Sequence, residues 1–294
     1  MRWRPMSDPA VLRRFSASAS RYDAHAHAQR LSAADLLAFT RQPPETGQPA
    51  SIFRSAQEGK TAGKNLEPAP KRGPAIRILE PGCGTGLYTQ LLLDAFPGAS
   101  IEGVDLSPAM VRIARDRIRD PRARFAVADA EEIAAGRYDL IASNATFQWF
   151  RSFDRTLARM ASFLSGGGRL AFSFFGPGTY AELDDALRSA QGGSKGDRAA
   201  AAGFHTRNGI AASMSAAFPR WDIVEREYRQ EFADLKELLR SIRYTGTGGG
   251  GARGAWTPGR LARVERAYRE RHGGIRATYQ VFLCRGDVPG RGGG

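Results

Sequence analysis

Disulfide frameworks and metal sites need residues that this sequence has in short supply. Its 294 residues include two cysteines, Cys83 and Cys284, and four histidines. The cysteines are far apart in the chain, which argues against a disulfide and agrees with a reducing, cytoplasmic location. Because the histidines lack the spaced cysteines or carboxylates of a metal site, we expect no metal.

Long apolar runs are also absent. No stretch approaches the roughly 18 apolar residues of a transmembrane helix, so we expect no association with a membrane. The basic segment 1–5 is not followed by an apolar run, and we do not interpret it as a signal peptide. With 42% hydrophobic residues the chain can still bury a core, in one large α/β domain with additions or in two small domains.

Acidic residues are too few to balance the basic ones, and the net charge is +13. Residues 76–176 hold 12 Lys/Arg and 11 Asp/Glu, whereas residues 1–75 hold 12 and 6 and residues 177–294 hold 19 and 13. The excess therefore lies outside the central part. It predicts attraction of an acidic partner, which can be nucleic acid, an acidic protein or an anionic small molecule. Solubility, in an Arg-rich and Gly-rich composition, explains the excess equally well.

Residues 76–87 carry the most informative pattern, which predicts a nucleotide site. An apolar strand ends at Glu80, and three alternate glycines follow, Gly82, Gly84 and Gly86. Glycines let the backbone approach a ligand closely at the C-terminal edge of a parallel sheet. These three glycines do not have the G-x-G-x-x-G spacing of dinucleotide sites, and Glu80 would repel a pyrophosphate but suit an ammonium group.

The second predicted strand, residues 100–104, ends in Asp105. A carboxylate at this place can accept hydrogen bonds from ribose hydroxyls. With Glu80 and the glycines, it resembles motif I and the ribose-binding acid of the class I S-adenosylmethionine-dependent methyltransferases. The resemblance implies that the glycine loop, with Cys83, packs under the methionine part of the cofactor and that Glu80 helps hold its amino group. The alternative is a glycine-rich turn of another Rossmann-like domain.

A third acidic residue, Asp129, follows a third predicted strand. In the resembling family this acid faces the adenine amino group, and the next backbone N–H, here that of Ala130, meets a ring nitrogen. Asp129 can equally cap a short helix. The full set that we expect to bind S-adenosylmethionine is Glu80, Gly82, Cys83, Gly84, Gly86, Asp105, Leu106, Asp129, Ala130 and Asn144.

Strands and helices alternate through the middle of the chain. We expect strands near 76–79, 100–105, 123–128, 138–143 and 168–174, and helices near 87–95, 108–118 and 152–164, with Gly166 to Gly168 ending the last helix. Such alternation predicts a parallel sheet with right-handed crossovers. With the resemblance, it predicts the Rossmann-like class I methyltransferase fold, an α/β fold with a seven-stranded, mostly parallel sheet and helices on both faces.

The segments on either side of this core are expected to add a lid, a linker and a substrate half to it. Residues 1–41 are predicted to form an N-terminal helical lid, amphipathic over 10–40, and residues 42–75 a flexible linker. The methyltransferase domain is expected over 76–294. It divides into a cofactor half, a substrate or partner half with a helical insertion, and a flexible tail, at 76–176, 177–286 and 287–294.

Three further segments narrow the resemblance to the malonyl-acyl carrier protein O-methyltransferases of biotin synthesis. They are residues 14–30, with Phe15, Tyr22-Asp and Gln29-Arg; residues 138–149, with Ser143-Asn144 and Gln148-Trp149; and residues 277–282, with Thr278-Tyr279. The resemblance covers most of the chain and fails over 42–75, about 190–203 and the glycine-rich loop near 247–255.

That resemblance implies methylation of the free carboxylate of a malonyl thioester carried on acyl carrier protein, or on coenzyme A. A carboxylate is ionised at neutral pH, since the pKa of an ordinary carboxyl group is about 4, so no general base is required. The candidate catalytic residues are Tyr22, His25, Gln148 and Trp149, and the candidate substrate-binding residues are Arg243, Tyr244 and Tyr279. Core packing or a surface role is the alternative for each. The basic segment 257–272 is either a docking surface for the carrier protein or a solvated face.

Other functions stay open on the sequence alone. They are methylation of another small carboxylate or of an aromatic or quinone substrate, and a catalytically silent, methyltransferase-like assembly factor. The Asn/Asp-Pro-Pro-Tyr motif of base methylases does not occur, so we expect no nucleic-acid partner. The sequence does not indicate an oligomeric state.

Overall fold

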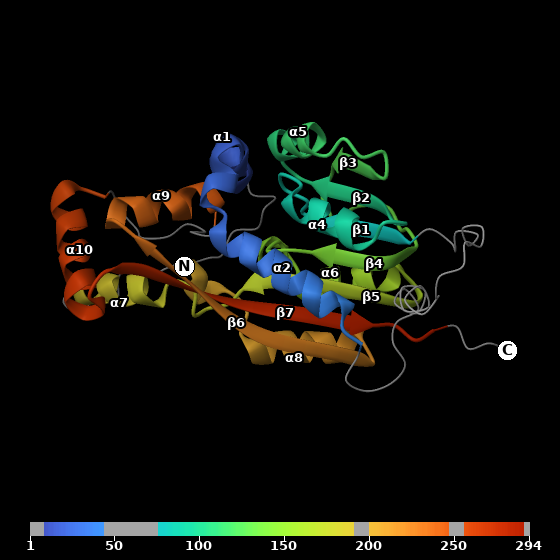
Figure 1. Cartoon of the computed structure of the whole chain (residues 1–294). Coiled ribbons are helices and arrows are strands. Elements are labelled where there is room, and N and C mark those ends of the chain that lie inside the picture. The colour runs from blue at the N-terminus through green and yellow to red at the C-terminus, as the bar shows by residue number, and fades with distance from the viewer. Residues whose placement is uncertain (1–8, 44–75, 191–199, 247–255, 291–294) are drawn as a thin grey trace, which may run out of the picture.

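The computed structural model of the chain describes residues 9–43, 76–190, 200–246 and 256–290 (Figure 1). Most of the predicted linker, residues 44–75, lies outside the described residues, as do most of 190–203, the loop 247–255 and the end of the predicted tail. No helix in the described ranges is long and apolar enough to cross a membrane.

Seven strands form one sheet in the order β3-β2-β1-β4-β5-β7-β6. Every neighbouring pair is parallel except the two pairs that include β7. The strands are β1 (Arg77–Pro81), β2 (Ser100–Asp105), β3 (Ala123–Val127), β4 (Tyr138–Ser143), β5 (Leu164–Phe175), β6 (Arg220–Phe232) and β7 (Ile275–Asp287). The predicted seven-stranded, mostly parallel sheet is confirmed.

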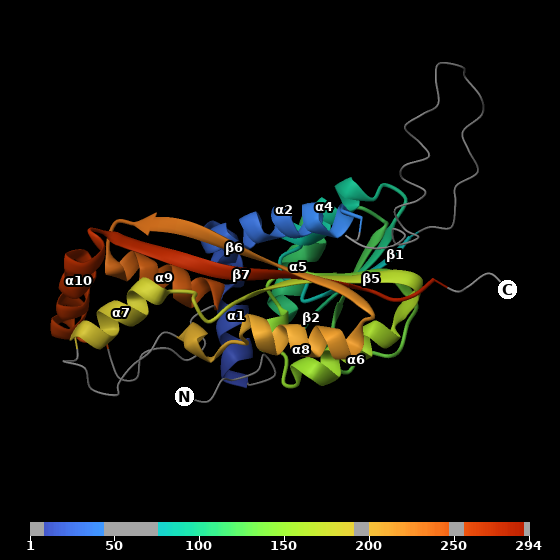
Figure 2. The ribbon, with the colours of Figure 1, turned by 90° about the horizontal axis from the view of Figure 1, so that it is seen from below.

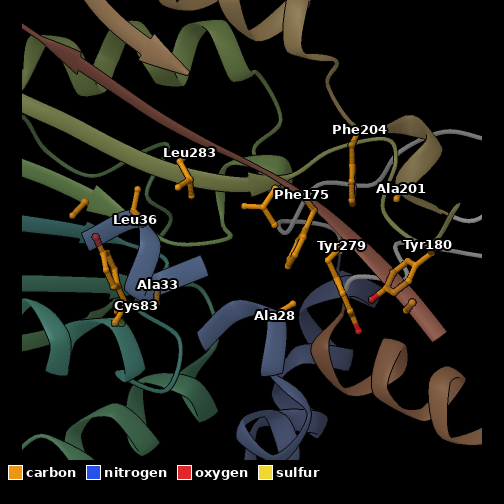
Figure 3. Packing of buried hydrophobic residues seen from close by; sticks show 14 of the residues in the cluster. Ala28, Ala33, Leu36, Cys83, Phe175, Tyr180, Ala201, Phe204, Tyr279 and Leu283 are labelled. Atoms are coloured by element: carbon orange, nitrogen blue, oxygen red, sulfur yellow. The ribbon is translucent and has the colours of Figure 1, made fainter. Parts of the chain in front are cut away.

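Helices cover both faces of the sheet (Figure 2). One face carries α2 (His27–Arg41), α4 (Leu87–Ala95) and α5 (Pro108–Arg117), and the other carries α6 (Phe153–Ser162) and α8 (Arg207–Ala217). Each face has its own buried cluster, one containing Leu36 and Leu92 and the other containing Leu157 and Met214. Figure 3 shows Leu36 of α2 and Leu283 of β7 in one cluster, so α2 shares a core with the last strand.

The β6–β7 pair extends beyond the rest of the sheet. The two strands pair from Arg220 with Asp287 to Phe232 with Ile275, whereas β5 pairs with β7 only as far as Val281. Around the projecting part lie α7 (Ala181–Ala190), α9 (Leu235–Thr245) and α10 (Pro258–His272) (Figure 1). This arm is the predicted helical insertion.

Two boundaries differ from the sequence expectation. The amphipathic segment 10–40 is two helices, α1 (Pro9–His25) and α2, because Ala26 leaves helical geometry with ψ near 42°. The glycines at 166–168 do not end a helix, because α6 has ended at Ser162 and the glycines belong to β5. Gly167 has a φ of +79°, and the register between β4 and β5 shifts at this place.

Candidate functional site

The glycine loop after β1 has a shape that side chains would prevent. Gly82, Gly84 and Gly86 have φ values of +70°, +54° and +82°, in the left-handed region that favours glycine. A Cβ on Gly82 would also overlap the side chain of Thr146, whose own Cβ would be 2.7 Å away. The N–H groups of Gly82 and of the buried Cys83 donate to the carbonyl of Val104, so β2 holds the loop at the sheet edge.

The carboxylate of Asp105, at the end of β2, is oriented by hydrogen bonds from the glycine loop and from the residues that follow β2. Its carboxylate accepts hydrogen bonds from the N–H of Gly84 at 3.0 Å and from the N–H of Ser107 at 2.8 Å. Burial raises the pKa of Asp105 to about 6, and these two hydrogen bonds oppose the rise. A carboxylate has about four acceptor sites, so this group can accept further donors such as ribose hydroxyls.

Glu80, at the end of β1, is a buried carboxyl group without a cationic partner among the described residues. Thr89 Oγ1 donates a hydrogen bond of 2.6 Å to its Oε2. Burial raises the pKa of Glu80 to about 8, and the nearby Asp105 adds to the rise. A cationic ligand beside Glu80 would favour its ionised form, and an ammonium group fits this environment.

A pocket opens beside the glycine loop and joins the ends of several strands. Its lining combines acidic groups with apolar walls, which suits a nucleoside attached to a cationic group. The lining residues are Gly82, Val104, Asp105, Leu106, Ala128, Asp129, Ala130, Glu131, Thr146, Trp149 and Phe150. The structure thus brings five of the expected cofactor-binding residues and one candidate catalytic residue to one cavity.

Asp129 is held by a residue that the sequence analysis missed. Its Oδ1 accepts the N–H of Glu131 at 2.9 Å, and its Oδ2 accepts from Arg151 Nη2 at 2.9 Å. Arg151 also pairs with Glu131 and Glu132. Arg151 follows the Gln-Trp turn by two residues, but no local pattern ties it to acids that precede it by about 20 residues.

Helix α1 lies over the cofactor edge, where it packs against α5 and α9. Phe15 of α1 meets Trp149 edge-on, with ring centroids 5.5 Å apart, and Tyr22 packs against the same cluster. Burial raises the pKa of Tyr22 well above its usual range, and the carboxylates of Asp23 and Asp105 add to the rise. The phenol therefore remains a neutral hydrogen-bond donor.

A polar clasp, defined here as Asp23, Thr85 and Arg117, fastens α1 to the glycine loop. Asp23 Oδ1 accepts from Thr85 Oγ1 at 2.7 Å, and Asp23 Oδ2 pairs with Arg117 of α5. Arg117 also donates to the carbonyl of Thr85 at 2.8 Å. Asp23 stands in the N-terminal segment that carried the resemblance, but no sequence signal connects it to the other two residues.

The turn after β4 contains two expected site residues with different surroundings. Asn144 Oδ1 accepts from Ser32 and Ser173, and its Nδ2 donates to the carbonyl of Gln29. Its side chain therefore joins α2 to β5. Gln148 is buried in η1 (Phe147–Trp149) and donates to the carbonyl of Ala145, while its Oε1 has no partner in the described parts of the chain.

The remaining candidates gather where α1 meets α9. The ring of His25 stacks on that of Tyr244 with centroids 4.8 Å apart. Burial lowers the pKa of His25, and the nearby Arg240 lowers it further. Arg243 is exposed on α9. Tyr279 is buried below α9, where its ring packs against Tyr180 at 5.1 Å, so it is not brought to the cofactor pocket.

Comparisons with known proteins agree with this geometry. Residues 78–168 match a family described as a methyltransferase domain. A malonyl-[acyl-carrier protein] O-methyltransferase of Paenibacillus sp. (strain JDR-2) is 33% identical over 82% of this chain and 83% of its own length. The enzyme of that name from Geobacter sulfurreducens is 36% identical over 70% of this chain and 81% of its own length.

The fold has a counterpart among solved structures. The crystal structure of the YcgJ protein of Bacillus subtilis superposes with a TM-score of 0.51 at 16% identity, covering 74% of this chain and 94% of that one. At this level of identity the likeness concerns the fold alone.

Proposed function

The chain belongs to the malonyl-[acyl-carrier protein] O-methyltransferase family, and on that premise we propose that it methylates the free carboxylate of malonyl-acyl carrier protein. The observation that carries the proposal is the 33% identity to the Paenibacillus enzyme over 82% of the chain. The product is the methyl ester of the malonyl thioester. We assign the reaction to an early step of biotin synthesis.

S-adenosylmethionine, when bound, would supply a methyl group carried on a sulfonium. A carboxylate oxygen would attack the methyl carbon, and the S–CH3 bond would break with the electron pair staying on sulfur, which would give the methyl ester and neutral S-adenosylhomocysteine. The substrate carboxylate is already ionised, so the protein need not remove a proton. The residues of this chain therefore need only bind the cofactor and the substrate, align the methyl group with the carboxylate, and exclude water.

We assign the cofactor to the pocket beside the glycine loop. Glu80 would receive the ammonium group, Asp105 the ribose hydroxyls, and Asp129 with the N–H of Ala130 the adenine edge. This assignment is supported by the buried carboxyl of Glu80, by the two hydrogen bonds that orient Asp105 and by the side chains that line the cavity. The side chain of Asn144 bonds to other protein groups, so Asn144 would contribute to cofactor binding by holding the backbone of its turn in place.

We propose that Tyr22 of α1 and Trp149 enclose the reacting methyl and carboxylate groups in the pocket. Trp149 lines the pocket, and aromatic faces attract a sulfonium cation. Gln148 has a buried oxygen with no partner in the described chain, which a ligand contact would satisfy. His25, Arg243 and Tyr244 are proposed to form the substrate side, where α1 meets α9, and buried Tyr279 would support α9 from below.

Mass spectrometry of the acylated carrier protein tests the proposed function. Purified protein is incubated with S-adenosylmethionine and malonyl-acyl carrier protein, with succinyl-acyl carrier protein and free malonate as controls. We expect a gain of one methyl group on the malonyl form alone. Binding of S-adenosylmethionine, measured by calorimetry in the same preparation, without methylation of the malonyl form would refute the proposed substrate while leaving the cofactor in place.

A further inference from the structure

Helices α1 and α9 lie side by side next to the candidate site (Figure 1). The contacts that join them include the stack of His25 on Tyr244 and a 2.5 Å hydrogen bond from Arg21 to the hydroxyl of Tyr244. Tyr22, one residue after Arg21, faces the cofactor edge. A molecule that reaches the site along this junction therefore meets the outer surfaces of both helices.

The outer face of α9 is basic. Lys236, Arg240 and Arg243 recur at helical spacing and are exposed, on the side opposite the buried Leu235 and Leu238. In the described ranges no carboxylate forms an ion pair with any of the three cations. Two exposed arginines of the adjoining α1, Arg13 and Arg21, extend the surface. We call Lys236, Arg240, Arg243, Arg13 and Arg21 the α1–α9 basic face.

Helix α10 has more arginines, but carboxylates neutralise part of its charge. Arg269 is bonded to Glu265 at 2.9 Å, and Arg271 is paired with Asp185 of α7. Exposed Glu270 lowers the local charge further. Figure 1 also places α10 at the far end of the arm, with α9 between it and α1. The basic helix that the sequence indicated is therefore farther from the site than the α1–α9 basic face.

We propose that the α1–α9 basic face is the docking surface for the acidic acyl carrier protein. The proposal rests on the proposed function, because it names the partner that delivers the malonyl thioester. Complementary charge steers an acidic partner to this surface and orients it there. Docking at the junction brings the thioester-bearing arm of the carrier beside Tyr22 and His25. Arg243 and Arg21 touch or adjoin the candidate substrate groups, so a test of docking must leave them unchanged.

The test compares two charge reversals of equal size. Lys236→Glu/Arg240→Glu alters the docking face, and Arg263→Glu/Arg266→Glu alters exposed arginines of α10 for which the structure shows no ion pair within its described ranges. Binding of fluorescently labelled malonyl-acyl carrier protein is measured by anisotropy at low and at physiological ionic strength. We expect the α9 variant to raise the Kd for the carrier about tenfold and to weaken its salt dependence. Binding is the readout here, rather than kcat, because Arg240 lies near His25. The α10 variant should change each value less than about twofold.

Three results would overturn the proposal. Equal weakening by both variants would show that net charge alone attracts the carrier, and weakening by the α10 variant alone would move the docking surface to α10. Binding of duplex DNA as tight as that of the carrier, with the same loss in the α9 variant, would make the face a general polyanion site. The affinity for S-adenosylmethionine, measured on each variant, shows whether the fold is intact.

Different results would refute the docking surface and the proposed function. Carrier binding that depends on α9, without methylation of the malonyl group, would refute the proposed function and leave the docking surface. Methylation that is indifferent to the α9 variant would refute the docking surface and leave the function.

Discussion

At the scale of single residues, the cofactor edge depends on positions that accept few substitutions. Gly82 combines a φ of +70° with a close approach to Thr146. We expect Gly82→Ala to destabilise the loop by about 2–4 kcal/mol, from left-handed backbone strain of about 1–2 kcal/mol and a steric overlap of similar size. Calorimetry should show at least tenfold weaker binding of S-adenosylmethionine.

Gly98→Ala is the matched control for Gly82→Ala. Gly98 lies in a turn at ordinary φ, and no heavy atom stands within 4 Å of its added Cβ. Its replacement should leave both binding and thermal unfolding unchanged. Wild-type affinity in Gly82→Ala would show that the glycine loop is not constrained as described.

Glu80 should couple cofactor binding to proton release. Its pKa is about 8 in the free protein, and a bound ammonium group lowers that pKa by favouring the carboxylate. Affinity for S-adenosylmethionine should therefore rise between pH 6 and about 8, with protons released near pH 7. Calorimetry in two buffers of different ionisation enthalpy measures the release. Glu80→Gln should bind at least tenfold more weakly and release fewer protons, and an unchanged release would contradict the assignment.

The same raised pKa affects the stability of the free protein. The folded state holds the proton of Glu80 more tightly than the unfolded chain does, where the pKa is near 4.5. The resulting stabilisation is complete below that value and is lost as the pH rises through about 8. The free wild-type protein should lose more stability than Glu80→Gln between pH 5 and 8.

At the scale of elements, the clasp of Asp23, Thr85 and Arg117 fastens α1 to the glycine loop and to α5. Asp23→Asn removes the ion pair and weakens the hydrogen bond, which together contribute about 1–2 kcal/mol. We expect faster amide exchange in α1 and several-fold faster release of S-adenosylmethionine, with little change in global stability. Asp116→Asn, which removes another carboxylate near the clasp on α5, is the control. Unchanged exchange in Asp23→Asn would show that the clasp does not hold α1.

Elements were predictable from the sequence where local chemistry determines them. The acid that ends β1 and the glycines after it mark a strand and a tight loop without any knowledge of the rest of the chain. The glycines at 166–168 were misread because glycine after a helix usually caps it. Here glycine is needed because a Cβ on Gly168 would stand 2.9 Å from the carbonyl oxygen of Ser165. That close approach exists only in the folded strand, so the local sequence does not reveal it.

The candidate site was predictable only in part, for the same reason. Glu80 and Asp105 lie at the ends of strands and Asp129 follows one, so their positions at the sheet edge could be inferred. The clasp joins Asp23 to Thr85 and to Arg117 across 62 and 94 residues, and no periodicity encodes contacts over such separations. The pairing of His25 with Tyr244 depends likewise on how α1 and α9 pack.

At the scale of the whole molecule, Arg169 joins distant parts of the chain. The guanidinium is fully buried and donates to Asp287 of β7 at 2.6 and 2.9 Å, and to the carbonyls of Thr40 and Gln42 at the end of α2. Arg169→Met leaves the carboxylate of Asp287 buried without its partner. We expect a loss of about 3–5 kcal/mol in the free energy of unfolding, measured with urea.

The double variant Arg169→Met/Asp287→Leu provides the control for that loss. Removing both charges should recover a substantial part of the stability, because no unpaired carboxylate remains. A loss below about 1 kcal/mol in the single variant would show that the buried pair contributes little.

The position of β7 between β5 and β6 also has a kinetic consequence. β7 is synthesised after all the other strands, yet it pairs with β5 on one side and with β6 on the other. Until β7 arrives, the edge of β5 lacks its partner, and β6 cannot join the sheet. Closing the sheet therefore waits for contacts of long sequence separation, which are slow to form and leave unpaired strand edges open to aggregation in the meantime.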